Sequence, residues 1–279
     1  MRPDGIKLKN FDPMYTVANY IMDKRYDAMN MITLDIPLEP LKAYLLDAKR
    51  RGHNVTHLGL ILAAYIRTTA EFPGLNRFII NRRAYAHKDF KVGMVVLKDG
   101  KINEHGSMAK CDFAMTDTIF EVQEKIDAYI QENRANQENN KTEKAVRFFL
   151  SVPGLVRVCI ALAKFLDRHG LLPRSVIDVS PFHCSLLITN LASIRTNHIY
   201  HHVYEFGTTS ISVAMGNARL VPKVQHGSIV FERCMPLGVV MDERIASGSY
   251  FALAFRRMRT YLTHPELLET PPEKVETDS

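Results

Sequence analysis

The stretch PLGVVMDERIASGSYFALAFRRMRTYLTHPELL, residues 236–268, decides the fold. Its first residues end a mostly apolar run over 228–241, which predicts a strand. Residues 245–263 predict a helix, and the charged stretch DERIASG lies between the two elements. A strand followed closely by a helix is typical of layered structures in which helices cover a sheet.

The rest of the chain alternates between helices and strands in the same way. Apolar spacing predicts helices over 12–25, 39–51, 55–72 and 116–133. Runs of alternating or continuous apolar residues predict strands over 28–38, 77–86, 89–100, 183–190 and 208–216. This order indicates an α/β or α+β layer structure rather than a bundle or a barrel.

Two further stretches carry distinctive motifs. LGLILAAYIRTTAEFPGLN (58–76) with AHKDFKVGMVV (86–96) combines a long helix, a P-x-L-N turn and an H-x-D-x-x-x-G strand, and LLITNLASI spans 186–194. Together with residues 236–268, they resemble the catalytic core of the 2-oxo acid dehydrogenase acyltransferases (dihydrolipoamide acyltransferases) and of chloramphenicol acetyltransferase. LKDG (97–100) is also similar to chloramphenicol acetyltransferase.

The resemblance implies a single chloramphenicol-acetyltransferase-like domain over residues 1–268, with a mixed sheet and flanking helices. It implies no lipoyl or subunit-binding domain, and the charged residues 269–279 are expected to form a disordered tail. It also implies a homotrimer with sites at the subunit interfaces, where coenzyme A enters one face of a channel.

The chain departs from the family at the site itself. The family motif D-H-R-x-x-D/N-G corresponds to Asp242, Glu243, Arg244, Ser247 and Gly248. Glu243 therefore replaces the histidine that serves as general base, and Ser247 replaces the supporting acid or amide. Residues 14–22 lack the arginine that the family carries in its opening helix. These joint changes indicate loss or redesign of the chemistry.

The serine of the family's T-I-S-N-L motif corresponds to Thr189. Its hydroxyl can still donate a hydrogen bond to an oxyanion, although threonine is also an ordinary strand residue. Glu243 is either a base or a structural, ion-paired residue. A carboxylate is a weak base at neutral pH, so the first role requires burial that strengthens it.

His201 and His202, in YHHVYEFGTTS (200–210), are the other candidates for the missing base. In an extended segment they are expected to point to opposite faces, so only one faces a channel. Packing or interface contact is the alternative role. The spacing argues against a metal site, because it offers no nearby cysteine or carboxylate ligand.

Composition restricts the partners. The net charge of +6 is a mild excess that favours an anionic ligand or a membrane surface, without the basic block of a nucleic-acid-binding arm. The four cysteines lack CxxC spacing and predict buried, reduced thiols. The polar N-terminus lacks an apolar signal core, so a cytoplasmic location is expected.

Residues 145–169 are strongly apolar, but Pro153, Arg157 and Lys164 argue against a helix that crosses a bilayer. Arg157, Lys164 and Arg168 share one helical stripe. Three interpretations remain: an amphipathic helix with a solvated basic edge, a helix in peripheral contact with a membrane, or a lid over an anionic ligand.

Two functions fit these features. The first is a divergent acyltransferase that uses an acyl-CoA thioester and an unknown acceptor. The second is a catalytically inactive relative that binds an acyl thioester or serves as an assembly subunit. The sequence leaves open whether a lipoyl protein is a partner.

Overall fold

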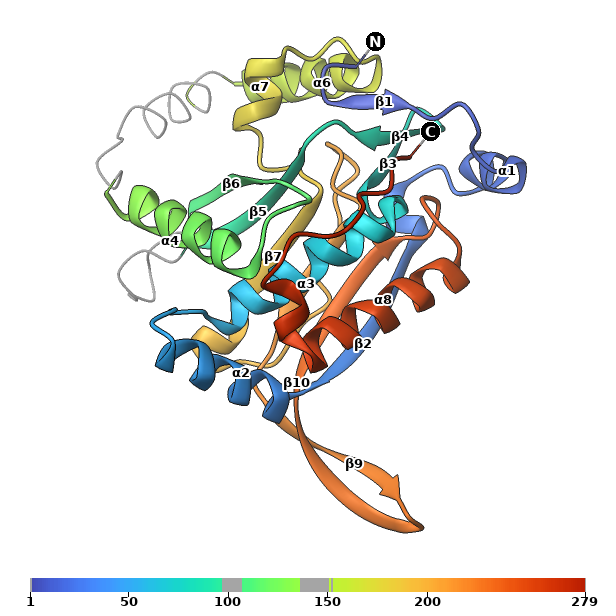
Figure 1. Ribbon diagram of the computed structural model, residues 1–279. Helices are drawn as coiled ribbons and strands as arrows, with labels where there is room; N and C mark the ends of the chain where they lie inside the picture. Colours follow the sequence, from blue (N-terminus) through green and yellow to red (C-terminus); the bar gives the residue numbers. More distant parts are fainter. Residues whose placement is uncertain (1, 97–106, 136–150, 152, 279) are drawn as a thin grey trace.

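A computed structural model describes residues 2–96, 107–135, 151 and 153–278. Helices and strands alternate along the chain (Figure 1). The helices are α1 (Pro13–Ile21), α2 (Leu38–Arg50), α3 (His57–Glu71), α4 (Ile119–Ala135), α6 (Leu155–Arg168), α7 (Arg174–Val179) and α8 (Gly248–Thr263). The strands are β1 (Gly5–Lys7), β2 (Met29–Pro37), β3 (Arg77–Ile80), β4 (Arg83–His87), β5 (Phe90–Val96), β6 (Ser107–Phe113), β7 (Leu186–Asn190), β8 (Ile211–Met215), β9 (Arg219–Gln225) and β10 (Ser228–Asp242).

The main sheet has the strand order β2-β10-β8-β7-β5-β6, and β9 pairs with β10 beside it. β7 runs parallel to both β5 and β8, and the other pairs are antiparallel, so the sheet is mixed. A small second sheet has the order β1-β4-β3.

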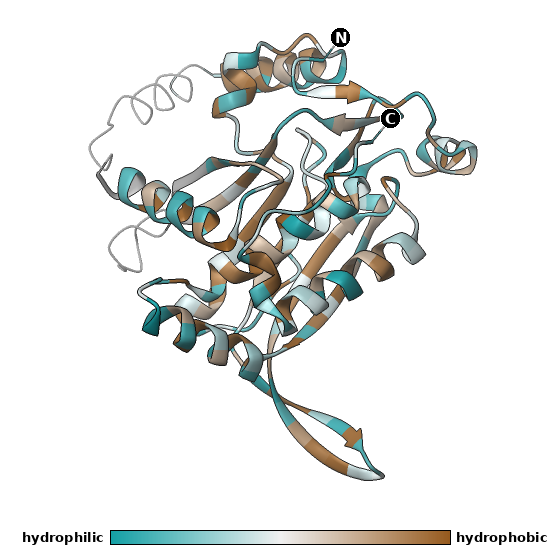
Figure 2. Cartoon of the chain, in the orientation of Figure 1, coloured by the Kyte–Doolittle hydropathy of each residue, from teal (hydrophilic) through white to brown (hydrophobic). Residues whose placement is uncertain are grey.

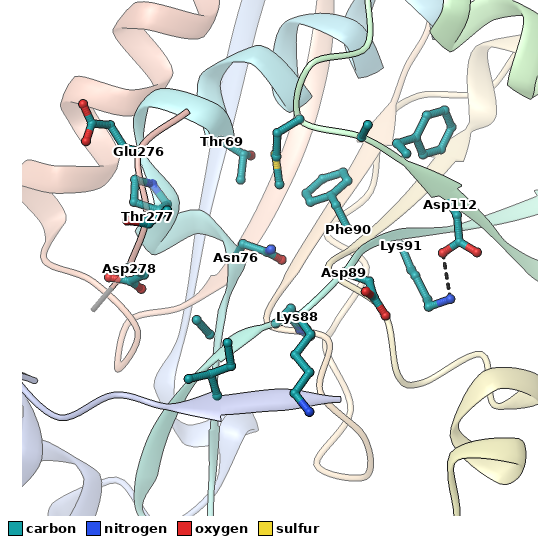
Figure 3. A pocket seen from close by; sticks show the side chains of 17 residues that line it. Thr69, Asn76, Lys88, Asp89, Phe90, Lys91, Asp112, Glu276, Thr277 and Asp278 are labelled. Carbon is teal, nitrogen blue, oxygen red and sulfur yellow. Dashed lines mark ion pairs between the residues drawn. The ribbon is translucent and has the colours of Figure 1, made fainter. Parts of the chain in front are cut away.

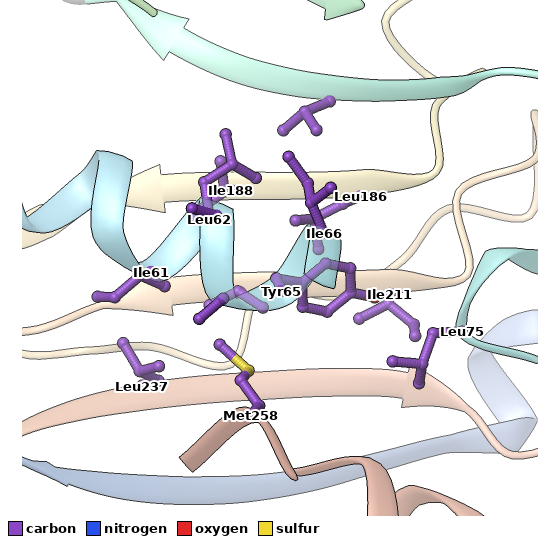
Figure 4. Close-up of a cluster of buried hydrophobic side chains, with 14 of the residues drawn as sticks. Ile61, Leu62, Tyr65, Ile66, Leu75, Leu186, Ile188, Ile211, Leu237 and Met258 are labelled. Atoms are coloured by element: carbon purple, nitrogen blue, oxygen red, sulfur yellow. The ribbon is translucent and has the colours of Figure 1, made fainter. Parts of the chain in front are cut away.

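Helices α3 and α8 cover one face of the main sheet and form the core with it (Figure 4). Every residue from Gly59 to Ala70 in α3 is buried, which explains why this helix is apolar on all sides. The labelled side chains of Figure 4 come from α3, the short 3-10 helix Pro73–Asn76, three strands and α8 and are Ile61, Leu62, Tyr65, Ile66, Leu75, Leu186, Ile188, Ile211, Leu237 and Met258.

The chain between β7 and β8 covers part of the opposite face. At Gly238 of β10 and Gly216, just after β8, the backbone of residues 198–199 approaches so closely that an added Cβ would clash with it. The Ser212 hydroxyl donates a hydrogen bond to the His201 carbonyl on the same face. The two glycines therefore permit this segment to lie directly on the sheet.

The β9–β10 hairpin projects from the body as a long arm (Figure 1). Hydrophobic residues alternate with polar ones along it (Figure 2). Its exposed apolar side chains include Leu220, Val224, Ile229 and Phe231. An apolar arm that leaves the domain is typical of a surface that contacts another chain.

Most of the predicted elements are present, and the main difference is in residues 77–86. They form the hairpin of β3 and β4 rather than one strand, because Asn81 and Arg82 adopt left-handed backbone angles, with φ of 49° and 61°. The polar composition of residues 132–144 predicts a loop, but all except 132–135 lie outside the described residues, as do 97–100, 145–150 and 152.

The C-terminal residues lie against the body, whereas their composition predicts a disordered tail. The Glu276 N–H donates to the Ala70 carbonyl at 2.8 Å. Asp278 forms an ion pair with Arg77. These contacts place the end of the chain beside α3 and β3.

Two of the four cysteines, Cys184 and Cys234, are buried, and Cys111 is partly buried. Cys159 is exposed on α6, so the prediction of a buried thiol is wrong there. It is exposed because only a narrow part of α6 packs against the rest of the chain.

Candidate functional site

The turn between β10 and α8 is fixed by a buried cluster of charges. Asp242 ends β10 with no exposed surface, and both of its carboxylate oxygens accept hydrogen bonds of 2.8 Å from the Arg244 guanidinium. Arg25 Nε lies 3.4 Å from the same carboxylate. One buried anion therefore holds two buried cations, and the geometry of residues 242–244 follows from this pairing.

Arg25 joins three separate parts of the chain. Its guanidinium donates to the carbonyls of Tyr204 at 2.6 Å, Gly207 at 3.1 Å and Ile79 at 3.0 Å. Burial lowers the pKa of Arg25, and Asp242 opposes this shift. Residues 14–22 contain no arginine, as the sequence indicates, but Arg25, which follows that helix, supplies a buried arginine beside Asp242.

Glu243 lies next to this cluster at the edge of the sheet. Its carboxylate accepts a 2.5 Å hydrogen bond from the Asn30 side chain on β2, and its N–H donates to the Ala28 carbonyl at 2.9 Å. Asn30 also lines a groove of 720 Å³ between β2 and α8. Glu243 is thus a half-exposed carboxylate with one fixed partner beside a groove.

Ser247 has a local structural contact. It is the N-cap of α8, and its hydroxyl accepts from the Tyr250 N–H at 3.1 Å. The same hydroxyl lies 2.9 Å from that of Ser249. Capping accounts for a serine at this position without any contact to Glu243.

Thr189 lies on the other face of the sheet. Thr189, Ala214, Gly238 and Thr33 form one row across β7, β8, β10 and β2. Glu243 follows Gly238 by five residues, and five residues of extended strand span about 16 Å. The Thr189 hydroxyl is buried and has no hydrogen-bond partner among the described residues. Within one chain, therefore, Thr189 and Glu243 do not meet.

His201 and His202 lie in an irregular segment rather than in a strand. Their ring centroids are 5.7 Å apart, and both rings contact Tyr204, at 6.2 and 4.9 Å. The expectation of opposite faces is wrong, because the two rings lie close together. His201 is half-buried and its carbonyl is held by Ser212, whereas His202 is exposed.

A third histidine in this segment, His198, lies closer to the row of Thr189. Its Nε2 is 3.1 Å from the Thr33 hydroxyl, which is also 2.6 Å from the Tyr200 hydroxyl. Burial, with Arg219 nearby, lowers the pKa of His198. No sequence pattern indicates this role, since the contact of His198 with β2 depends on the close approach at Gly238.

A second cavity, of 640 Å³, lies at the start of β5 (Figure 3). Asp278 and Glu276 of the C-terminal segment lie beside Thr69 and Asn76, and Asp89, Lys91 and Asp112 lie on the far side. None of the candidate residues lines this cavity.

Among the described residues, no group of three or more His, Cys, Asp or Glu side chains is arranged to hold a metal ion. No described helix is long and apolar enough to cross a membrane. Contact of residues 145–169 with a membrane surface stays a prediction.

Comparison with known proteins gives similarity in structure alone. No family model and no curated protein match the sequence. A probable dihydrolipoamide acetyltransferase from Listeria monocytogenes has a TM-score of 0.58 and 11% identity over 93% of this chain and 95% of that one. A chloramphenicol acetyltransferase has a TM-score of 0.55 and 12% identity over 94% of this chain and 100% of its own.

The dihydrolipoamide acetyltransferase of Azotobacter vinelandii is similar too, with a TM-score of 0.58 and 11% identity over 91% of this chain and 88% of that one. That structure was determined to investigate a serine, a histidine and an asparagine in the catalytic mechanism. These likenesses span nearly the whole chain and confirm the mixed-sheet fold that the sequence motifs predict.

Proposed function

We propose that this chain, which has the chloramphenicol-acetyltransferase-like fold, is a divergent acyltransferase that takes its acyl group from a coenzyme A thioester. The observation that carries the proposal is the buried cluster of Arg25, Asp242 and Arg244. Burial of three charged groups costs free energy that a hydrophobic cluster would not. Such a cluster is well suited to hold the turn after β10, and Glu243 with it, in one geometry.

The reaction needs an acceptor hydroxyl or thiol, which attacks the thioester carbonyl carbon. A bond forms from the acceptor to that carbon, the C–S bond breaks, and coenzyme A leaves as a thiol that takes up the acceptor's proton. A base must hold this proton in transit, and Glu243 or a histidine of 198–202 would do so. The unpartnered Thr189 hydroxyl would donate a hydrogen bond to the carbonyl oxygen as it becomes negative.

Two copies of the chain are needed for this arrangement. Thr189 and Glu243 lie on different faces and far apart in one chain, so they can act together only across an interface. The resemblance to trimeric acyltransferases supports a homotrimer in which Thr189 of one copy meets Glu243 of the next. The groove between β2 and α8 supports thioester binding, since Ile32 and Phe255 line its apolar part and Arg259 supplies a cation.

The protein is therefore expected to be a trimer of about three times 31.8 kDa. Replacing Ile229 and Phe231 on the β9–β10 arm by glutamate should dissociate it, because two exposed apolar side chains would become charged within the interface. Light scattering coupled to gel filtration measures the mass. Val179→Glu serves as the control, because Val179 is at least as exposed as Ile229 and Phe231 but lies on α7.

A monodisperse monomer of the wild-type protein at micromolar concentration would refute the trimer. If the double variant remains a trimer, the β9–β10 arm is not part of the interface.

The second candidate function is a non-catalytic subunit that binds an acyl thioester. The Asn30 amide favours it, because its hydrogen bond already occupies an oxygen of the Glu243 carboxylate that would have to accept the proton. Incubation with acetyl-CoA distinguishes the two proposed functions. The acyltransferase is expected to bind acetyl-CoA and to release coenzyme A when an acceptor is present, whereas the non-catalytic subunit is expected only to bind it.

A further inference from the structure

A separate cleft of 320 Å³ lies behind the buried charge cluster. Besides Arg244, four parts of the chain form it: the segment after α1, the end of β3 with the β3–β4 turn, the C-terminal half of α6, and residues 205–206. Arg244 connects it to the candidate site. The lining residues are Asp23, Lys24, Ile79, Ile80, Asn81, Arg82, Lys164, Asp167, Arg168, Glu205, Phe206 and Arg244.

The acidic side chains of this cleft are already engaged. Asp23 forms an ion pair of 2.6 Å with Arg82. Glu205 accepts the Arg25 N–H at 2.7 Å. Asp167 is bound by Arg2 at 2.7 Å. Each acidic side chain that lines the cleft therefore already has a hydrogen-bond or ion-pair partner.

Among the described residues, three cations of the cleft have no carboxylate at ion-pair distance, and Asp23 attracts two of them, Lys24 and Arg168, only from farther away. Among the described residues, Lys24 and Lys164 make no ion pair, and Arg168 donates only to the neutral Asn81 side chain, at 3.2 Å. All three extend from different points around one concavity. Cations gathered around a cleft with low-dielectric walls raise the local positive potential and attract anions.

The position of α6 is fixed, so this arrangement is built into the fold. Asp167 of α6 is buried and contacts Arg2, His183 and the Gly207 N–H. Burial alone would raise the pKa of Asp167, but His183 and Arg2 hold it below the usual range of a carboxyl group. The anchored Asp167 holds Lys164 and Arg168, on either side of it in the helix, at the cleft.

We infer that this cleft binds the phosphate or carboxylate group of a small-molecule ligand, with Lys24, Lys164 and Arg168 as its ligating cations. Lys164 and Arg168, two of the three residues of the basic stripe of α6, then bind an anion rather than facing only solvent. Guanidinium and ammonium groups bind such oxyanions through charge-assisted hydrogen bonds. The inference deepens the proposed function, because it assigns an anionic group to a ligand that reaches the edge of the candidate site.

Calorimetric titration of the full chain with inorganic pyrophosphate and with succinate tests the cleft without any reaction. The wild-type protein is expected to bind at least one of them, and K164Q/R168Q to bind it about 10- to 100-fold more weakly, because two charge-assisted contacts are lost. Arg157→Gln is the control: it removes one positive charge from the same helix, but Arg157 does not line the cleft. Circular dichroism checks that each variant is folded.

Titrations with coenzyme A and dephospho-coenzyme A distinguish the sources of the anion. Weaker binding of coenzyme A by K164Q/R168Q, with dephospho-coenzyme A unaffected, would assign the cleft to the ribose phosphate. Loss of succinate binding alone would assign it to a carboxylate substrate. Absence of binding by the wild type, or equal affinities of wild type, control and double variant, would overturn the inference while leaving acetyl-CoA turnover, and the proposed function, unaffected.

Discussion

Replacing His201 by glutamine is expected to lower the rate of acyl transfer by about 10²- to 10⁴-fold, the usual contribution of a positioned general base. An imidazole changes charge near neutral pH and suits this task better than the hydrogen-bonded Glu243 carboxylate. His201 is the better candidate of the adjacent pair. Its carbonyl is fixed by Ser212 and its ring is half-buried, whereas His202 is exposed. His202→Gln should therefore leave the rate largely unchanged.

The measurement is the release of coenzyme A from acetyl-CoA in the presence of thiol and alcohol acceptors, with the trimer confirmed for each variant. His198→Gln is a further comparison on the same segment, and Glu243→Gln tests the carboxylate. Small and equal effects of H201Q and H202Q would assign the pair to packing. Loss of activity with Glu243→Gln alone would transfer the role of base to the residue that occupies the histidine position.

Asp242→Asn is expected to lower the free energy of unfolding by about 3–5 kcal/mol, because it leaves Arg25 and Arg244 buried without their anion. That is a large part of the stability of an ordinary domain. Unfolding in urea, followed by circular dichroism, gives the change. Asp35→Asn is the matched control: it removes an exposed ion pair of 3.0 Å with Arg219 and should cost less than about 1 kcal/mol.

A loss for D242N no larger than that for D35N would contradict the role of the buried cluster. If D242N is too unstable to purify, the midpoint of thermal unfolding in a cell lysate supplies the comparison. A normal midpoint there would be equally contradictory.

Much of the fold follows from the sequence because its signals are local. The apolar spacing of α3 and the continuous apolar run at the end of β10 both reflect burial on the covered face of the sheet. The motif around Glu243 likewise identifies the turn before α8. β9 gives a weaker signal, since it contains Pro222 and pairs only with β10 at the margin of the sheet.

The contacts of the site are harder to predict because they join distant parts of the chain. Arg25 meets Asp242 only after β2 has paired with β10. His198 reaches Thr33 only because Gly238, which has no side chain, lets the backbone of Ile199 lie directly on the sheet. The three cations of the cleft come from α6 and from the segment after α1, and no spacing in the sequence relates them.

The central claim is that the trimer is built to hold an acyl thioester of coenzyme A. Calorimetric titration with acetyl-CoA tests it most directly, since binding requires neither an acceptor nor an active base. We expect acetyl-CoA to bind saturably with one site per chain, and coenzyme A to be released once the right class of acceptor is added. Binding without release under any acceptor would establish the non-catalytic function, and absence of binding at millimolar acetyl-CoA to a folded trimer would contradict the account.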